Sequence, residues 1–243
     1  MGNVEKLKDL IKKSKSIVFF GGAGVSTQSG IPDFRSADGL YSESYGAVSP
    51  ETVLSHDFFV HHTAEFYEFY KSKMLYPDAQ PNAAHFALAE LEKRGKLKAV
   101  ITQNIDGLHQ KAGSETVHEL HGSAMRNNCM KCKKVFSLDY VIESNGVPVC
   151  NVCGSTIKPD VVLYGEMLDD DVWEKAAKAT AESDLLIVGG TSLAVYPAAN
   201  IVRYFDGDNI VLINMSETRF DKKASLVIRE PIGDVFEQAM KLL

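Results

Sequence analysis

The chain has 243 residues, of which 45% are hydrophobic and 24% charged, a composition ordinary for a globular protein with one large domain or one domain and a small module. Its formal net charge of −6 argues against tight nucleic-acid binding, which needs a cationic surface. No apolar run approaches the roughly 20 residues of a membrane span, and the lysine-rich first 16 residues indicate an amphipathic helix rather than a signal peptide. We therefore expect a cytoplasmic protein with no membrane partner and no specific nucleic-acid partner.

Short apolar runs alternate with longer helical patterns along the chain. The apolar runs predict strands at 17–20, 99–102, 161–164, 185–189 and 210–214, with a weaker one at 226–228. The helical patterns fall at 4–13, 63–74, 82–94, 170–181, 197–204 and 233–242. Most of the predicted strands are apolar throughout, which is typical of a sheet covered on both faces. The alternation predicts an α/β fold with a Rossmann-like, doubly wound parallel sheet.

Two stretches, 36–80 and 124–159, interrupt this alternation, and neither has the pattern to form a core alone. We expect a Rossmann-like domain made of 1–35, 81–123 and 160–243. The two interruptions, 36–80 without a good strand and 124–159 with the cysteines, would together form a smaller domain against the large one. Because ligands favour the crevice at the carboxyl ends of parallel strands, the active site should lie between the two domains.

The first predicted strand ends abruptly in Gly21-Gly-Ala-Gly24. Glycines at this point let a pyrophosphate approach the backbone and rest on the N–H groups at a helix start, which predicts a dinucleotide site. The loop departs from the G-x-G-x-x-G pattern, because Thr27 replaces the third glycine and no acidic residue follows a second strand. It continues instead through Gly30-Ile-Pro-Asp-Phe-Arg35, whose side chains are suited to covering the cofactor and acting on it.

Amide and carboxylate side chains follow the strand predicted at 99–102, in Thr102-Gln-Asn-Ile-Asp106. Asn104 and Asp106 together offer the donor and acceptor groups that recognise a carboxamide. A helix N-cap, with either residue satisfying free N–H groups, explains the same segment equally well.

Two histidines, His118 and His121, lie three residues apart before the cysteine module. Histidine titrates near neutrality and is the commonest general base, although a histidine in an apolar strand is more often structural. His121 is the stronger candidate because Gly122 follows it at the expected domain junction.

All four cysteines lie in two Cys-x-x-Cys pairs, Cys129 with Cys132 and Cys150 with Cys153. This spacing predicts one Zn²⁺ held by four thiolates, with no open position for water and hence a structural role. Metal-free buried thiols or disulfides are the alternative. The neighbouring lysines are compatible with a nucleic-acid zinc ribbon, but a solvated basic face fits the acidic chain better.

Two later strands also end in short polar residues. Gly189-Gly-Thr-Ser192 follows one and Asn214-Met-Ser-Glu217 the next, where the adenosine half of a dinucleotide would bind. Simple turns are the alternative interpretation of both segments.

Taken together, these motifs resemble those of the sirtuins, the NAD-dependent protein lysine deacylases, in family order along nearly the whole chain. The segments that carry the resemblance are Gly22–Ser26, Gly30–Arg35, Thr102–Asp106, His121-Gly122, the cysteine quartet, Gly190–Ser192 and Asn214. The resemblance implies a Rossmann-like domain, a small domain of a zinc-ribbon module at 124–159 plus a helical module at 36–80, and NAD as a consumed cosubstrate.

The resemblance also assigns roles to residues. It implies His121 as the general base, with Asn104 and Gln103 near the nicotinamide ribose. Ile105 and Asp106 match the nicotinamide pocket. The remaining NAD positions are Ala23, Thr27, Phe34 and Arg35 on the pyrophosphate and ribose side, and Thr191, Ser192, Asn214, Met215, Asp234 and Val235 on the adenosine side. An acyl-lysine peptide would add as a strand between 162–168 and 192–195, contacting Val162, Leu163, Gly165, Glu166 and Val195.

The reaction implied by the resemblance moves the acyl group of a lysine side chain to ADP-ribose. The products would be nicotinamide, free lysine and O-acetyl-ADP-ribose, with His121 deprotonating a ribose hydroxyl. Sirtuins that prefer succinyl or malonyl lysine carry Tyr-x-x-Arg in the helical module, whereas this chain has Tyr67-Glu-Phe-Tyr70. The missing cation favours acetyl and similar uncharged acyl groups.

Two other functions compete with an NAD-consuming deacetylase. One is a zinc-ribbon nucleic-acid-binding protein whose Rossmann domain only senses NAD. The other is a hydride-transferring dehydrogenase, which the missing third glycine weakens.

Overall fold

A computed structural model describes residues 2–34, 36, 39–40 and 48–243. Its larger part is a six-stranded sheet in the order β3-β2-β1-β7-β8-β9, in which every neighbouring pair is parallel. The strands are β1 Ile17–Gly21, β2 Leu97–Thr102, β3 Val117–Glu119, β7 Leu185–Gly189, β8 Asn209–Ile213 and β9 Leu226–Ile228. Within this sheet the order reads 3-2-1-4-5-6, which confirms the predicted doubly wound Rossmann-like architecture.

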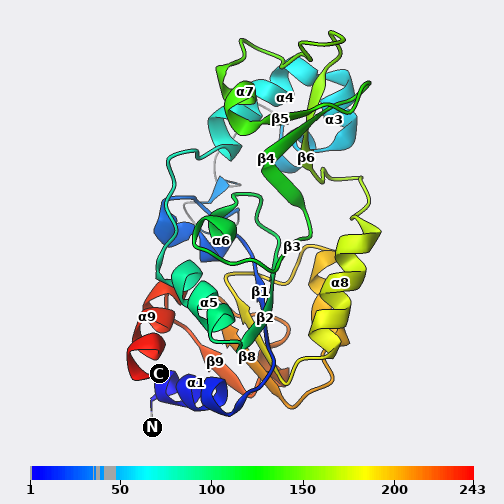
Figure 1. The fold of residues 1–243 in the computed structure, drawn as a ribbon. Helices are drawn as coiled ribbons and strands as arrows, with labels where there is room; N and C mark the ends of the chain where they lie inside the picture. The colour runs from blue at the N-terminus through cyan, green and yellow to red at the C-terminus, as the bar shows by residue number, and fades with distance from the viewer. Residues whose placement is uncertain (1, 35, 37–38, 41–47) are drawn as a thin grey trace.

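Helices cover both faces of the large sheet, as the apolar strands require (Figure 1). Alternate residues of β1 point to opposite faces, so Phe19 packs in one core and Phe20 in the other. The first core includes side chains from α1 Asn3–Lys13, α5 Ala83–Lys93 and α9 Ile232–Leu242. The second includes side chains from α8 Asp170–Ala181 and the 3₁₀ helix η5 Ala198–Tyr204.

A second, three-stranded antiparallel sheet lies at the far end of the molecule from α1 (Figure 1). Its strands are β4 Gly122–Cys129, β5 Val135–Ser137 and β6 Ile157–Val161. The helices of this region are α2 Pro50–Val53, α3 His56–His61, α4 Thr63–Phe69, with a π-helical turn at Tyr70–Met74, and α7 Leu138–Glu143. One apolar cluster joins α3, α4, α7 and this sheet, so the helical and cysteine-containing segments share a core.

Two predicted elements differ from the structure. The apolar run 161–164 is no strand of the large sheet, because β6 ends at Val161 and pairs antiparallel with β4. The predicted helix at 63–74 is regular only to Phe69 before it widens into the π-helical turn. The sequence pattern also missed β3, which is three residues long and only half-buried. None of the described helices is long and apolar enough to cross a membrane.

Candidate active site

A cavity of about 710 Å³ lies at the carboxyl ends of β1, β2, β7 and β8, where the strand order reverses. Its other wall comes from the helical segment and from the chain after β6. Most of the NAD-side residues predicted from the sequence line it, namely Ala23, Thr27, Phe34, Gln103, Asn104, Ile105, Asp106, Thr191, Ser192, Asn214 and Met215. The same cavity is lined by His121 and by the predicted peptide-side residues Val162, Leu163, Gly165, Glu166 and Val195.

Three predicted residues are not among those that the structure places at the cavity. Arg35 lies outside the described residues. Asp234 is exposed and accepts a hydrogen bond from Gln28 Nε2 at 2.8 Å, and Val235 is fully buried in the first core. Their assignment to NAD stays a prediction.

The glycine-rich turn after β1 packs directly on the turn after β7. Gly24 donates its N–H to the Gly190 carbonyl at 2.8 Å. Gly190 has a φ of 60°, and a Cβ built on it would lie 2.3 Å from the Val25 nitrogen. This contact requires glycine and fixes the two loops against each other at the floor of the cavity.

Asp106 satisfies a free N–H group at the start of a helix, as the capping alternative expected, and it also bonds to the glycine-rich loop. Its recognition of a carboxamide stays a prediction. One carboxylate oxygen accepts from Leu108 N–H at 2.9 Å and caps α6, Leu108–Lys111. The other accepts from the Ser26 hydroxyl at 2.6 Å, and Asn104 Nδ2 donates to that same hydroxyl oxygen at 3.1 Å. Burial raises the pKa of Asp106, and these hydrogen bonds partly oppose the rise. The network ties the 104–106 segment to the glycine-rich loop across 80 residues of sequence.

His121 is held in one tautomer by the backbone. Its Nδ1 lies 3.1 Å from the Gln103 carbonyl oxygen, an acceptor, so Nδ1 carries the proton and Nε2 has a free lone pair. Burial lowers the pKa of His121 below 6.5, and the bond to Gln103 partly opposes this. At neutral pH the side chain is therefore an uncharged base in the cavity wall.

The backbone at position 122 requires a glycine directly after His121. Its φ is 73°, and a Cβ built there would lie 2.0 Å from the Asp160 carbonyl oxygen. The close approach lets β4 start against β6 directly after His121. His121 consequently sits where the chain leaves the large sheet for the small one (Figure 1).

Asn214 shapes the cavity rather than offering a free amide to a ligand. Its Oδ1 accepts from Thr191 N–H at 2.9 Å, and its Nδ2 donates to the Thr191 carbonyl at 2.8 Å. These two bonds clamp the loops after β7 and β8 together. The groups left for a ligand on this side include the exposed side chains of Ser192 and Met215.

The sequence reasoning did not identify a buried polar layer beneath the glycine-rich loop. Asn82 Nδ2 donates to the Val25 carbonyl at 2.8 Å and to the Ser29 hydroxyl at 2.9 Å. The adjacent His85 packs on His109 with ring centroids 4.7 Å apart, and both side chains are almost fully buried. Burial lowers the pKa of His85 to about 4 and that of His109 to about 3. The sequence Pro81-Asn82 directly before a predicted helix is the feature from which this supporting role of Asn82 could have been inferred.

In the helical segment, the uncharged Tyr70 borders the cavity at the position where sirtuins with the Tyr-x-x-Arg motif have a cation. Tyr67 is fully buried and donates its hydroxyl proton to the Ile157 carbonyl. Tyr70 is also fully buried and borders the cavity. Lys71, the next residue, is not among the cavity-lining residues, and its ammonium group donates to the carbonyls of Ser144 and Gly146 at 2.7 and 2.9 Å.

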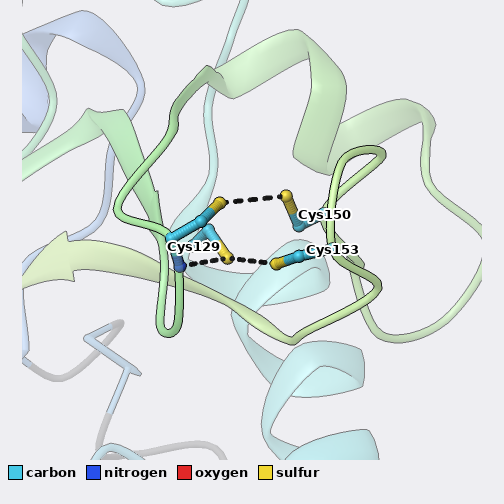
Figure 2. Close-up of side chains that lie close together, drawn as sticks. Cys129, Cys150 and Cys153 are labelled. Carbon is cyan, nitrogen blue, oxygen red and sulfur yellow. Dashed lines mark hydrogen bonds between the residues drawn. The ribbon is translucent and has the colours of Figure 1, made fainter.

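The four cysteines come together as a single cluster whose sulfur atoms all lie within 4.8 Å of one another. Figure 2 shows Cys150 and Cys153 reaching from one loop toward Cys129 on the other. The sulfurs of Cys129 and Cys153 are 3.4 Å apart, and those of Cys132 and Cys150 are 3.6 Å apart. Tetrahedral zinc with Zn–S bonds near 2.3 Å places its sulfurs roughly 3.8 Å apart. The residues therefore fit a closed four-thiolate zinc site.

The strand order and cavity define an α/β protein with a cavity at the switch point of a Rossmann-like sheet, the place where such sheets bind dinucleotides. Comparison with known proteins narrows this class. The model of the Sir2 family matches residues 22–197. A protein of Clostridium acetobutylicum named NAD-dependent protein deacetylase is 56% identical over 98% of each chain. One of the same name from Clostridium perfringens is 57% identical over 96% of each chain.

Solved structures agree with these matches. A Sir2 protein with a deacetylated p53 peptide and 3′-O-acetyl ADP ribose has a TM-score of 0.90 and 40% identity, over 98% of each chain. Another, described as Sir2 with a p53 peptide and NAD⁺, has a TM-score of 0.86 and 41% identity, over 100% of this chain and 98% of that one. The chain belongs to the Sir2 family, the sirtuins.

Proposed function

We propose that the protein is an NAD-dependent protein lysine deacetylase. It transfers the acetyl group of an acetyl-lysine side chain to the ADP-ribose part of NAD, consumes one water molecule and releases nicotinamide, O-acetyl-ADP-ribose and free lysine. The observation that carries this proposal is the position of His121, whose cavity is lined on one side by the dinucleotide loops and on the other by the segment after β6. The names of the relatives, at 56% and 57% identity over nearly the whole chain, support the same activity.

His121 supplies the general base. Because Nδ1 is committed to the Gln103 carbonyl, Nε2 is the atom that accepts the proton of a ribose hydroxyl. Its lowered pKa keeps this atom unprotonated at neutral pH. No charged nucleophile is required, since the NAD cosubstrate supplies both the acceptor ribose and the leaving group.

Asn104, Ile105 and Asp106 are proposed to hold the nicotinamide end, with Gln103 beside its ribose. The network that ties Ser26 to Asn104 and Asp106 supports this role, because it holds the two loops in a fixed arrangement before a ligand arrives. The pyrophosphate and ribose side is assigned to Ala23, Thr27, Phe34 and Arg35, and the adenosine side to Thr191, Ser192, Asn214, Met215, Asp234 and Val235.

Zinc in the cysteine cluster has a structural role. Four protein thiolates fill the tetrahedral shell of the metal and leave no position for a substrate or water. The cluster lies beside the small sheet, where Cys129 is the last residue of β4, and its ligands Cys129 and Cys150 belong to the apolar core of that region. Metal binding therefore stabilises the small sheet and the helices packed on it.

Proteins and peptides that contain acetyl-lysine are the substrates. The peptide is proposed to lie between 162–168 and 192–195, in contact with Val162, Leu163, Gly165 and Val195, with Glu166 nearby. Exposed residues on both segments, Tyr164 and Gly165 on one and Ser192 and Ala194 on the other, support strand addition, which reads the peptide backbone more than its side chains. A solved Sir2 structure, 39% identical with a TM-score of 0.87, is described as bound to an acetylated peptide.

The division into domains and the cellular location are part of this proposal. The NAD-binding domain would comprise 1–35, 81–123 and 160–243, and the small domain 36–80 and 124–159. The shared apolar core of the helical and cysteine segments supports the division. A cytoplasmic location is supported by four cysteines arranged for a metal rather than for stable disulfides.

Mass spectrometry of the products from NAD and a panel of acyl-lysine peptides tests the activity. We expect nicotinamide, deacetylated peptide and O-acetyl-ADP-ribose in equal amounts, formed only when peptide and NAD are both present. Nicotinamide release without an acyl peptide, or reduced nicotinamide absorbance, would instead support NAD sensing or hydride transfer. The zinc-ribbon nucleic-acid alternative has only the local lysines in its favour, against a net charge of −6.

A further inference from the structure

Glu166 is a charged side chain of the cavity wall whose carboxylate is fully occupied by protein groups. Its Oε2 accepts from the Leu163 N–H at 2.9 Å and from Lys158 Nζ at 3.0 Å. Its Oε1 lies 2.7 Å from His56 Nδ1. Leu163 belongs to the proposed peptide segment, Lys158 to β6 and His56 to α3. One carboxylate therefore joins the small sheet, the helical segment and the peptide segment.

Backbone bonds hold the same segment to the start of α3 and to the connection between β3 and β4. Tyr164 donates its N–H to the Leu54 carbonyl at 3.0 Å and accepts from His56 N–H at 2.9 Å. Val162 donates its N–H to the His121 carbonyl at 3.0 Å. The segment is thus fixed on one side to the histidine proposed as the base and on the other to the helical segment. Glu166 closes the turn between these attachments, because its own N–H also donates to the Leu163 carbonyl at 2.9 Å.

The environment of Glu166 keeps it ionised and engages both of its carboxylate oxygens in bonds to the protein. Its side chain is 21% exposed and that of Lys158 is 20% exposed. Burial alone would raise the pKa of Glu166, but the hydrogen bonds from Leu163 N–H, His56 and Lys158 hold it below 4.5. With both oxygens committed, Glu166 acts on a peptide through the backbone of Leu163 rather than by direct contact.

The geometry points to Glu166 as a positioning residue that presents the 162–168 segment as a preformed edge for the substrate peptide. The inference rests on the proposed deacetylase function and deepens it. Without the carboxylate, the Leu163 N–H loses its acceptor and the turn from Leu163 to Glu166 is free to move. A peptide that binds by strand addition would then have to order this edge on binding, which weakens peptide affinity. The NAD side of the cavity would be unaffected.

Steady-state kinetics of Glu166→Ala and Glu166→Gln test this role, with acetyl-peptide and NAD varied separately. For Glu166→Ala we expect the KM for peptide to rise about tenfold, with kcat at saturating peptide and the KM for NAD within about twofold of the wild type. Glu166→Gln keeps an oxygen for Leu163 N–H and should raise the peptide KM only about threefold. This conservative variant also guards against misfolding of the alanine variant.

Asp57→Asn is the matched control. Asp57 follows His56 on α3, its side chain is 89% exposed, and it takes no part in the Glu166 network. We expect wild-type kinetics for this variant. Amide hydrogen exchange supplies an independent readout, because exchange in 162–166 should accelerate in Glu166→Ala and stay unchanged in Asp57→Asn.

Three results would overturn the inference. They are an unchanged peptide KM in Glu166→Ala, an equal rise in the KM values for peptide and NAD, and a fall in kcat with the peptide KM unchanged. Failure of the proposed function itself is recognised separately, since the wild-type protein would then release no nicotinamide from NAD and acetyl-peptide.

Discussion

The large sheet and the small cysteine-containing sheet bury their apolar side chains in different ways. All residues of β1 and β7 are buried, and each of the two cores lies between sheet and helices. The small region has one core, which is rich in aromatic side chains and includes two of the cysteines. The larger part is stabilised by apolar burial over long strands, whereas the smaller part depends on its metal ligands as well. Substitutions or treatments that act on one part alone should separate the contribution of apolar burial from that of metal binding.

Removal of zinc should have the largest effect and should be confined at first to the small region. We expect chelation, or Cys153→Ser, to abolish deacetylation and to remove hydrogen-exchange protection from β4, β5, β6 and α7, because site formation and local folding are coupled. Val152→Ala is the control, since this side chain lies in the same knuckle and is 67% exposed. Metal analysis should find one zinc per chain. Protein purified without chelator that contains no zinc would contradict the prediction.

Loss of the histidine at the boundary between the two parts should remove the chemistry and leave both folds intact. We expect His121→Ala to lower kcat by about 10²–10⁴-fold with NAD affinity and thermal unfolding nearly unchanged. His118→Ala is the matched comparison, because His118 lies on β3 three residues earlier and is not among the cavity-lining residues. An active His121→Ala beside an inactive His118→Ala would show that the wrong histidine was chosen.

The small region should also decide which acyl group is accepted. The buried and uncharged Tyr70 offers no cation to a succinyl carboxylate, which would lose hydration without compensation. Acetyl peptides should exceed succinyl peptides in kcat/KM by at least about 10²-fold, roughly 3 kcal/mol.

Two variants test the cause of this preference. Tyr70→Arg should lower the ratio of kcat/KM for acetyl peptides to kcat/KM for succinyl peptides, because it supplies a cation. Lys71→Met should leave this ratio unchanged, since Lys71 is bonded to Ser144 and Gly146. Equal activity on both peptides in the wild type would contradict the prediction and direct attention to Lys73, which also borders the cavity.

The smallest effect is expected from mild acid, which should lower the stability of the large part through His85 and His109. Both are uncharged in the fold, with pKa values lowered from 6.5 to about 4 and about 3, so the unfolded chain binds more protons below pH 6.5. The free energy of unfolding should therefore fall as the pH falls from 6.5 toward 4, by about 1.4 kcal/mol per pH unit for each histidine.

Urea denaturation at several pH values measures this dependence. His109→Leu should make the free energy of unfolding less dependent on pH, because one of the buried groups that take up protons on unfolding is then absent. His61→Gln should not, since the side chain of His61 is 65% exposed. A wild-type unfolding free energy that stays constant between pH 6.5 and 5 would rule out the buried pair as the acid-sensitive element.

The different construction of the two parts also determines what the sequence could predict. Long apolar runs gave β1 and β7 within one residue, and paired Cys-x-x-Cys spacing gave the metal cluster. The run 161–164 was misassigned because an apolar segment crossing between two sheets has the same local pattern as a buried strand. The hydrophobic pattern of a sequence indicates which residues are buried, but it does not identify the element that buries them.

The residues of the candidate site could largely be predicted from the sequence, whereas the contacts that orient them could not. Glycines, amides and a histidine at strand ends were visible as local patterns, and most of these residues line one cavity. The contacts that orient them join residues far apart in sequence, such as Ser26 with Asp106 and His56 with Glu166. A single sequence carries no local signal for such pairs, so the supporting layer emerged only from the structure.

The attachment of the 162–168 segment to Leu54, His56 and His121 has a consequence for how long an acetyl mark survives. With these backbone groups already bonded, a substrate meets a fixed edge and must itself be extended to pair with it. A lysine within a stable helix has its own N–H and C=O groups engaged and is reached only after local unfolding, whose free energy adds to the barrier. Acetyl groups in flexible tails and loops should therefore turn over quickly. Those in ordered helices should persist, so the rigidity of this segment makes the lifetime of a mark depend on the disorder of the protein that carries it.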